Sequence, residues 1–155
     1  MVLDTFSVQK VATGRAMARI LLMEDDTDYA AMIAEVLSVS GHEAKIRSNA
    51  TDAWEELRKN RYDLLITDIY VKRDGAYTAD GGVTLLGRVR SPANSIDQNL
   101  RWMIDMPILA ITGGQAVPGG YDPLKQAGDM GANFLMRKPI GLEELTQAVD
   151  QLLGN

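Results

Sequence analysis

Residues 20–26 read Ile-Leu-Leu-Met-Glu-Asp-Asp, a short apolar run that ends in three acidic side chains. Four further apolar runs follow, at about residues 44–47, 64–66, 108–111 and 134–136. Most of them do not alternate in polarity, which is typical of strands covered on both faces of a parallel sheet. The run at 44–47 does alternate, which predicts a half-exposed edge strand.

Helical patterns separate these runs. Apolar side chains recur at helical spacing in five segments, at about residues 29–37, 50–57, 83–86, 123–130 and 142–152. Capping side chains are expected just before the first two of these helices, at Asp26 and Asn49. A strand–helix unit repeated five times predicts an α/β fold, a doubly wound (βα)5 arrangement with helices on both faces of a five-stranded parallel sheet.

Composition narrows the class of protein. The 155 residues fit one domain, and the net charge of −5 argues against direct binding to nucleic acid. The chain has no cysteine, which excludes disulfides, thiol catalysis and cysteine-bound zinc, and which fits a cytoplasmic location. No apolar run is long enough to predict membrane insertion.

The two ends of the chain lead to expectations about its organisation. Residues 1–17 mix charged side chains with short apolar pieces, so we interpret them as an N-terminal extension that is disordered or non-native. Residues 18–155 are interpreted as the whole domain. Because the chain stops soon after the fifth helical segment, we expect a stand-alone domain without a second, output domain.

Polar residues gather where the predicted strands end. Glu24 and Asp25 follow the first strand, Asp68 the third, Thr112 the fourth and Lys138 the fifth. In an open parallel sheet, ligands bind beyond the carboxyl ends of the strands. Carboxylates that are held close together repel, and at least one pKa value should rise unless a cation neutralises them.

The available ligand atoms indicate which cation fits. Carboxylate oxygens without cysteine or a nearby histidine favour Mg²⁺, which also takes water and phosphate oxygens as ligands. A lysine beside such a site suits a phosphoryl group, and a threonine hydroxyl can donate to the same group.

Four segments, taken in order, carry a family resemblance. They are Ile-Leu-Leu-Met-Glu-Asp-Asp, Tyr-Asp-Leu-Leu-Ile-Thr-Asp, Ile-Leu-Ala-Ile-Thr-Gly and Gly-Ala-Asn-Phe-Leu-Met-Arg-Lys-Pro-Ile. Together they resemble the receiver domain of bacterial two-component response regulators, over about residues 18–154. The resemblance implies the flavodoxin-like strand order 2-1-3-4-5. It also implies a phosphorelay switch, not a turnover enzyme, which takes a phosphoryl group from a histidine kinase or histidine phosphotransfer protein and signals to a downstream protein.

The resemblance also implies a role for each strand-end residue. Asp68 would be the phospho-acceptor, and Glu24 and Asp25 would hold Mg²⁺ together with it. Tyr70 would offer its backbone carbonyl oxygen to the metal.

Two more strand-end residues and a peptide bond have implied roles. Thr112 would bond a phosphoryl oxygen, and Lys138 would pair with the phosphoryl group. The peptide bond before Pro139 would be cis.

Three features depart from the family pattern. The Asp-Gly pair expected after the acceptor is best matched by Asp80-Gly81, which is unusually distant, with Asp74-Gly75 as an earlier candidate. Leu135 stands where receivers usually have an aromatic residue, and the neighbouring Phe134 is expected to point to the opposite face of the sheet. The stretch from Thr112 to Lys138 is somewhat long for the family, and long connections are expected at residues 91–105 and 113–121.

Two rival functions remain open at this point, because a third, a nucleotide or flavin binder of flavodoxin-like fold, would need a Gly-rich phosphate loop after the first strand, and none follows it. A phosphatase similar to the haloacid-dehalogenase family could use Asp68 as its nucleophile, but it would need an aspartate where Tyr70 stands. A pure interaction module that is never phosphorylated is the second rival. Two expectations concern packing: His42 should be exposed in a turn, and the apolar residues at 100–106 should pack on their own domain.

Overall fold

The computed structural model describes residues 16–73, 76–78, 80–113 and 122–154. Residues 1–15 of the predicted N-terminal extension therefore lie outside the described part, as does most of the predicted long connection at 113–121. None of the helices in the described ranges has the length and apolar character that a membrane crossing requires.

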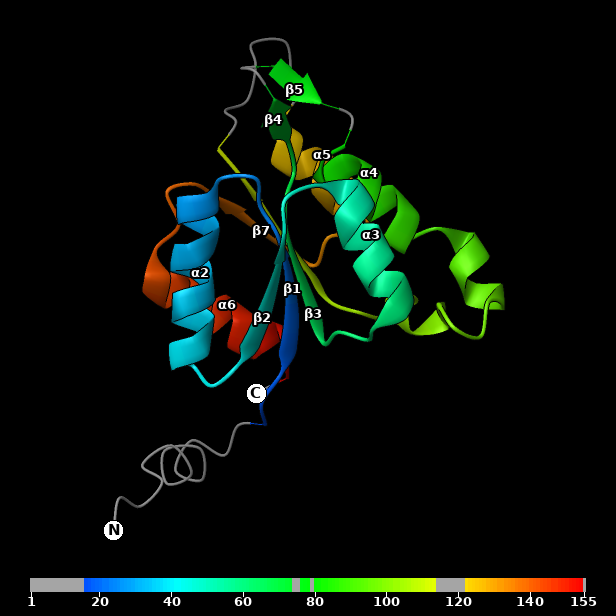
Figure 1. Ribbon diagram of the computed structural model, residues 1–155, viewed down its shortest axis with the longest axis horizontal. Helices are drawn as coiled ribbons and strands as arrows, with labels where there is room; N and C mark the ends of the chain where they lie inside the picture. The colour runs from blue at the N-terminus through cyan, green and yellow to red at the C-terminus, as the bar shows by residue number, and fades with distance from the viewer. Residues whose placement is uncertain (1–15, 74–75, 79, 114–121, 155) are drawn as a thin grey trace.

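Five parallel strands form the central sheet (Figure 1). Their bounds are Arg19–Met23 (β1), Glu43–Arg47 (β2), Leu64–Asp68 (β3), Ile108–Thr112 (β6) and Phe134–Arg137 (β7). The spatial order is β2-β1-β3-β6-β7, so the predicted order 2-1-3-4-5 is confirmed. Every residue of β3 and β6 is buried, whereas β2 is an edge strand with mixed exposure, as its alternating sequence predicts.

In the described part of the chain, five α-helices cover the two faces of this sheet. Their bounds are Thr27–Val39 (α2), Ala50–Lys59 (α3), Gly82–Val89 (α4), Pro123–Asp129 (α5) and Leu142–Leu152 (α6). Apolar side chains of α2 and α6 form one core cluster with the sheet, and those of α3, α4 and α5 form the other. Figure 1 shows α2 and α6 on one side and α3 and α4 on the other. The doubly wound α/β prediction is confirmed.

Local sequence explains where the first two of these helices begin. The carboxylate of Asp26 accepts a hydrogen bond from the Tyr29 backbone N–H at 3.0 Å, and the Asn49 side chain accepts one from Asp52 at 2.8 Å. Each interaction satisfies a backbone donor that a helix start leaves without an intrahelical partner. Both predicted caps are confirmed.

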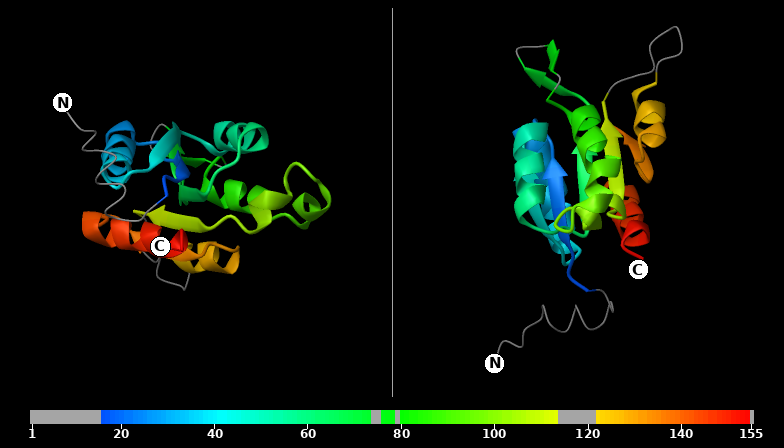
Figure 2. Two further views of the ribbon diagram at one scale, coloured as in Figure 1. Left: turned by 90° about the horizontal axis from the view of Figure 1, so that it is seen from below. Right: turned by 90° about the vertical axis from the view of Figure 1, so that its right-hand side faces the viewer.

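A short antiparallel hairpin was not predicted. Its strands are Val71–Arg73 (β4) and Ala76–Thr78 (β5), with Arg73 paired to Ala76. Figures 1 and 2 show the hairpin standing beyond the carboxyl end of β3. The earlier candidate pair, Asp74-Gly75, lies outside the described residues. The hairpin accounts for the extra length between Asp68 and α4.

The predicted long connection before β6 contains two 3-10 helices, Pro92–Ile96 (η1) and Arg101–Ile104 (η2). Met103 and Met106 are buried, and Leu100 and Trp102 pack against the α3–α4–α5 core cluster, so the expectation of packing on the same domain is confirmed. Arg90 holds this connection in place. Its guanidinium donates to four backbone carbonyl oxygens and to one side chain, those of Met103, Ile104, Met106, Gly131 and Asn133.

The expectation that His42 is exposed is wrong. Its side chain is 5% exposed, and its Nδ1 accepts a hydrogen bond from the Ala18 backbone N–H at 3.1 Å. Ala18 lies just before β1, and its carbonyl oxygen accepts from the Glu43 N–H at 2.9 Å. The imidazole therefore links the residues that precede β1 and β2, and this contact depends on a residue distant in sequence.

Candidate functional site

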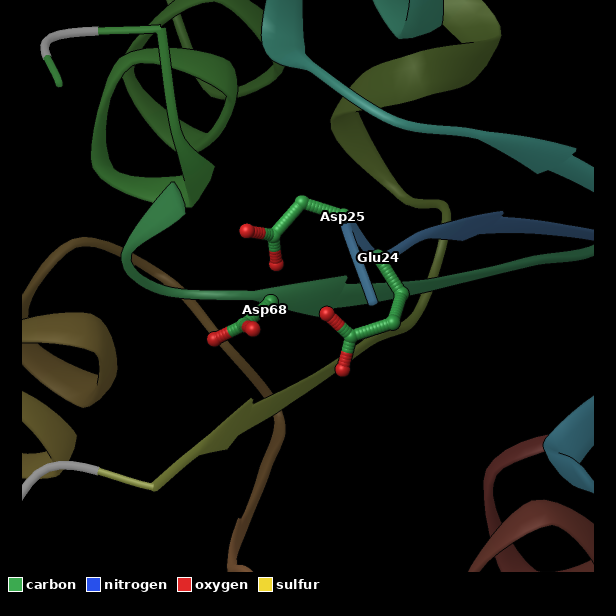
Figure 3. Close-up of side chains that lie close together, drawn as sticks. All are labelled: Glu24, Asp25 and Asp68. Carbon is green, nitrogen blue, oxygen red and sulfur yellow. The ribbon is translucent and has the colours of Figure 1, made fainter. Parts of the chain in front are cut away.

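Three carboxylates converge at the carboxyl ends of β1 and β3 (Figure 3). Glu24, Asp25 and Asp68 each offer an oxygen atom, and these atoms lie within 4.8 Å of one another. Glu24 is 1% exposed and Asp68 is 4% exposed, whereas Asp25 is partly exposed. The predicted acidic cluster therefore forms, with one member accessible to solvent.

The register of the sheet brings these residues together. In the β1–β3 pair Met23 lies opposite Thr67, so the residue that follows each of them reaches the same level of the sheet. Glu24 also donates its backbone N–H to the Arg47 carbonyl oxygen of β2 at 3.0 Å. Asp68 is thus the last residue of β3, and Glu24 and Asp25 directly follow β1, so the ordered strands hold the acidic residues in place.

Lys138 reaches the cluster from the end of β7. Its Nζ lies 3.0 Å from Asp68 Oδ2 and also contacts Glu24 Oε1. Its backbone N–H donates to the Thr112 carbonyl oxygen at 2.8 Å, and the Thr112 side chain is buried at the end of β6. The peptide bond between Lys138 and Pro139 is cis, as expected. All four strand ends named from the sequence therefore meet.

Burial and charge shift the pKa values of two groups in this cluster. Burial, followed by the negative charge of Asp68, raises the pKa of Glu24 to about 8, although the hydrogen bond from Lys138 opposes the shift. Burial by itself disfavours the charged ammonium of Lys138, but hydrogen bonds and charges of Glu24 and Asp68 outweigh burial and raise its pKa. Lys138 is thus the positive charge that Glu24 and Asp68 share.

The first residues after Asp68 stay close to it. The backbone N–H of Tyr70 donates to Asp68 Oδ1 at 3.4 Å. The Tyr70 hydroxyl lies 3.4 Å from the Gln126 side-chain oxygen in α5. Tyr70 therefore contacts the Asp68 carboxylate through its backbone, and its side chain connects the start of the hairpin with α5.

Helix α4 begins against the backbone of Asp68. A Cβ atom at Gly82 would lie 1.9 Å from the Asp68 carbonyl oxygen, so the close packing at this point requires glycine. The preceding Asp80 accepts hydrogen bonds from Thr51 at the start of α3, at 2.8 Å from its N–H and 2.9 Å from its hydroxyl. The choice of Asp80-Gly81 as the start of the third predicted helix is confirmed.

The missing aromatic residue leaves a different surface on β7. Phe134 packs against the core cluster shared with α2 and α6, whereas Leu135 is exposed beside Gly128 of α5. The two side chains thus lie on opposite faces, as predicted. The position that usually holds the aromatic partner of the threonine holds an aliphatic side chain here.

Sequence reasoning missed one residue that contacts the site. Tyr29 was assigned only to the apolar stripe of the first helix, but its ring lies 4.7 Å from Lys138 Nζ. Its hydroxyl oxygen accepts a hydrogen bond from the Ile140 backbone N–H at 3.0 Å. A hydroxyl in an otherwise apolar helical stripe, three residues beyond an acidic cap, is the only sequence signal for this contact.

The donor set fits a hard divalent cation. The converging atoms are carboxylate oxygens, one of them on a partly exposed side chain, so retained water molecules could complete the coordination. The pKa of Glu24 is raised first by burial and then by the negative charge of Asp68, and a cation would offset that charge. Mg²⁺ is the ion that best matches such ligands when phosphate oxygens are also to be bound.

Comparisons with known proteins agree with this geometry. The family model described as "Response regulator receiver domain" matches residues 20–150. The response regulator receiver protein CpdR of Brucella abortus is 31% identical over 88% of this chain and 98% of its own length. The transcriptional regulatory protein RprY of Bacteroides fragilis is 29% identical over 87% of this chain and 49% of its own length. The chain thus spans about half the length of some regulators that it matches.

Solved structures give the same result. A crystal structure of a candidate response regulator from Chloroflexus aurantiacus is 26% identical, with a TM-score of 0.71, and the match covers 90% of this chain and all of that one (100%). A CheY-like receiver domain protein from Methanospirillum hungatei has a TM-score of 0.69 at 19% identity, with 90% of this chain and 95% of that chain covered, which bears on the fold alone.

The phosphatase alternative gains no support from these matches, and Tyr70 occupies the position where that chemistry needs an aspartate. Receiver domains act in signalling, not as conventional turnover enzymes. With its matched family, strand order and strand-end carboxylates, the chain belongs to the receiver domains of two-component response regulators.

Proposed function

We propose that this protein is a phosphorylation switch in which the carboxylate of Asp68 accepts a phosphoryl group in the presence of Mg²⁺. One observation carries the proposal: the oxygens of Glu24, Asp25 and Asp68 lie within 4.8 Å of one another, with Lys138 Nζ 3.0 Å from Asp68. A nucleophilic carboxylate, a cation site and a fixed ammonium are the groups that phosphoryl transfer to an aspartate would use.

In the proposed reaction an Asp68 oxygen attacks the phosphorus atom of a phosphohistidine in line with the bond to nitrogen. The new O–P bond forms as the P–N bond breaks, and the imidazole leaves after it takes a proton from solvent. Lys138 stays beside the transferred group and offsets its charge. Thr112, at the end of the neighbouring strand, donates its hydroxyl to a phosphoryl oxygen.

The metal would be held by Glu24, Asp25 and Asp68, directly or through water, and by the backbone carbonyl oxygen of Tyr70. Bound Mg²⁺ supplies positive charge that offsets the carboxylates and the phosphoryl oxygens. Glu24 must be deprotonated to serve as a ligand, which links metal binding to the release of its proton.

The proposed partners follow from this chemistry. A histidine kinase or a histidine phosphotransfer protein supplies the phosphoryl group, and a downstream protein reads the phosphorylated surface. The proposed location is the cytoplasm, which fits a chain without cysteine. The match to the receiver protein CpdR over 98% of that protein supports a switch that signals by protein–protein contact and binds no nucleic acid directly.

Intact-mass spectrometry tests the proposal. The protein is incubated with phosphoramidate and Mg²⁺, and we expect one phosphoryl group per chain in the wild type and none in Asp68→Asn. Asp129→Asn is the matched control, because Asp129 is an exposed aspartate at the end of α5. Equal labelling of wild type and Asp68→Asn would contradict the proposal, as would steady release of phosphate from a generic phosphate monoester.

A further inference from the structure

Tyr29 contacts the residues on both sides of Pro139, in the turn that follows β7. Its ring centroid lies 4.7 Å from Lys138 Nζ, and its hydroxyl oxygen accepts a hydrogen bond from the Ile140 N–H at 3.0 Å. Pro139 lies between these two residues, and the peptide bond before it is cis. One side chain therefore contacts the ammonium group of this turn and anchors the backbone on its far side.

The loop that carries the acidic pair fixes the place of Tyr29. Its backbone N–H donates to Asp26 Oδ1 at 3.0 Å, which caps the start of α2. Asp26 directly follows Glu24 and Asp25, and its own N–H lies 3.3 Å from Glu24 Oε2. The ring also packs against the core cluster of α2 and α6. The side chain is thus held by a capped helix and by the core.

The ammonium group that the ring contacts sits on a flexible stem. A lysine side chain has four rotatable carbons and loses much rotamer freedom when its end is fixed. The ammonium group of Lys138 is attracted by two carboxylates, those of Glu24 and Asp68. The negative face of an aromatic ring attracts a cation within about 6 Å of its centroid, and Tyr29 supplies such a face.

We propose that Tyr29 is a positioning residue for Lys138, an inference that rests on the proposed phosphoryl transfer to Asp68. When a divalent cation and a phosphoryl group occupy the cluster, Glu24 and Asp68 are engaged with them, and the ring keeps the ammonium near the transferred group. The hydroxyl holds the Ile140 N–H, which fixes the turn from which Lys138 projects. A leucine or methionine at this helical position could fill the core but could do neither.

Two substitutions separate the ring from the hydroxyl. Tyr29→Leu removes both, and Tyr29→Phe removes only the hydroxyl. At saturating Mg²⁺ and phosphoramidate, we expect Tyr29→Leu to be phosphorylated about fivefold more slowly than wild type, which corresponds to about 1 kcal/mol. We expect Tyr29→Phe to stay within about twofold of the wild-type rate, because it keeps the ring face.

A spectroscopic measurement reports the ring contact directly. In wild-type protein the ε-methylene protons of Lys138 should resonate upfield of those of the exposed Lys45 and Lys59, because they lie near an aromatic face. Tyr29→Phe should keep this shift and Tyr29→Leu should lose it. This measurement does not depend on phosphorylation. The shift in wild-type protein tests the contact even if a Tyr29 variant folds poorly.

Tyr62→Phe is the matched control. Its hydroxyl bonds Glu56 at 2.6 Å and its ring lies 5.0 Å from the Arg19 guanidinium, but it lies next to the start of β3, away from the site. We expect it to keep the wild-type rate and the Lys138 shift.

Three outcomes overturn the proposed role of the Tyr29 ring: a wild-type rate in folded Tyr29→Leu, equal losses in Tyr29→Phe and Tyr29→Leu, or no upfield shift of Lys138 in wild type. If wild-type protein itself is not labelled on Asp68, the proposed function fails instead.

Discussion

Substitution of Glu24 by glutamine should change how stability depends on pH in metal-free protein. The Glu24 carboxyl is 1% exposed, and its pKa is raised from 4.5 to about 8, first by burial and then by the charge of Asp68. In the unfolded chain the same group returns to its ordinary pKa. Between the two values the folded state therefore holds a proton that the unfolded state has released.

The sign and size of the effect follow from this difference. A raised folded-state pKa contributes stability that is complete below the unfolded pKa and is lost as the pH rises through the folded pKa. The unfolding free energy of the wild type should thus fall between about pH 4.5 and about pH 8. One titrating group can change the unfolding free energy by at most about 1.4 kcal/mol per pH unit. Over an interval of about two pH units, the change is therefore at most about 2.8 kcal/mol.

Urea denaturation in EDTA, at about pH 5.5 and about pH 7.5, measures the effect. The loss between the two pH values should be larger in wild type than in Glu24→Gln, because glutamine does not titrate. Saturating Mg²⁺ should restore wild-type stability at the higher pH, where Glu24 is more often deprotonated, and should do little for the variant. If the unfolding free energy depended on pH identically in wild type and Glu24→Gln, the reasoning that the pKa of Glu24 is raised in the folded protein would be refuted.

Three further substitutions probe other contacts. Gly82→Ala should lower the unfolding free energy by about 2–4 kcal/mol and weaken Mg²⁺ binding, because a Cβ would lie 1.9 Å from the Asp68 carbonyl oxygen. The control is Gly87→Ala, where a Cβ would make only an ordinary contact at 3.8 Å. In urea denaturation this control should raise the unfolding free energy by up to about 1 kcal/mol. Lys138→Ala should slow phosphorylation at least about tenfold yet tighten Mg²⁺ binding in calorimetry, because the ammonium competes for the same carboxylates; weaker binding would argue against that competition. Arg90→Ala should lower the unfolding free energy by about 3 kcal/mol, since it removes five hydrogen bonds at the opposite end of the sheet, while labelling of Asp68 by mass spectrometry persists; lost labelling in folded protein would contradict that separation.

Much of the fold could be predicted because its strands are buried on both faces. The run Leu64-Leu65-Ile66 has no polar alternation, and every residue of the strand that contains it is buried. The same reasoning predicted where the site lies, because parallel strands end at one edge of the sheet. Asp68 is the last residue of one such strand, and Lys138 directly follows another. Neither result required knowledge of contacts between distant side chains.

The features that were missed depend on partners far along the chain or on very short elements. The strands Val71–Arg73 and Ala76–Thr78 are too short for a period-two pattern to stand out. His42 is buried because its imidazole accepts from Ala18, a residue 24 positions away. Tyr29 meets Ile140 across 111 positions, and in a helical stripe its ring cannot be told from an ordinary core side chain.

The central claim is that Asp68 itself carries the phosphoryl group. Borohydride reduces an aspartyl phosphate to homoserine, so treatment of the phosphorylated protein followed by peptide mapping identifies the modified residue. We predict homoserine at position 68, only when Mg²⁺ and the phosphodonor were both present. Homoserine at another aspartate, or none at position 68 in fully labelled protein, would contradict the assignment of Asp68 as the acceptor.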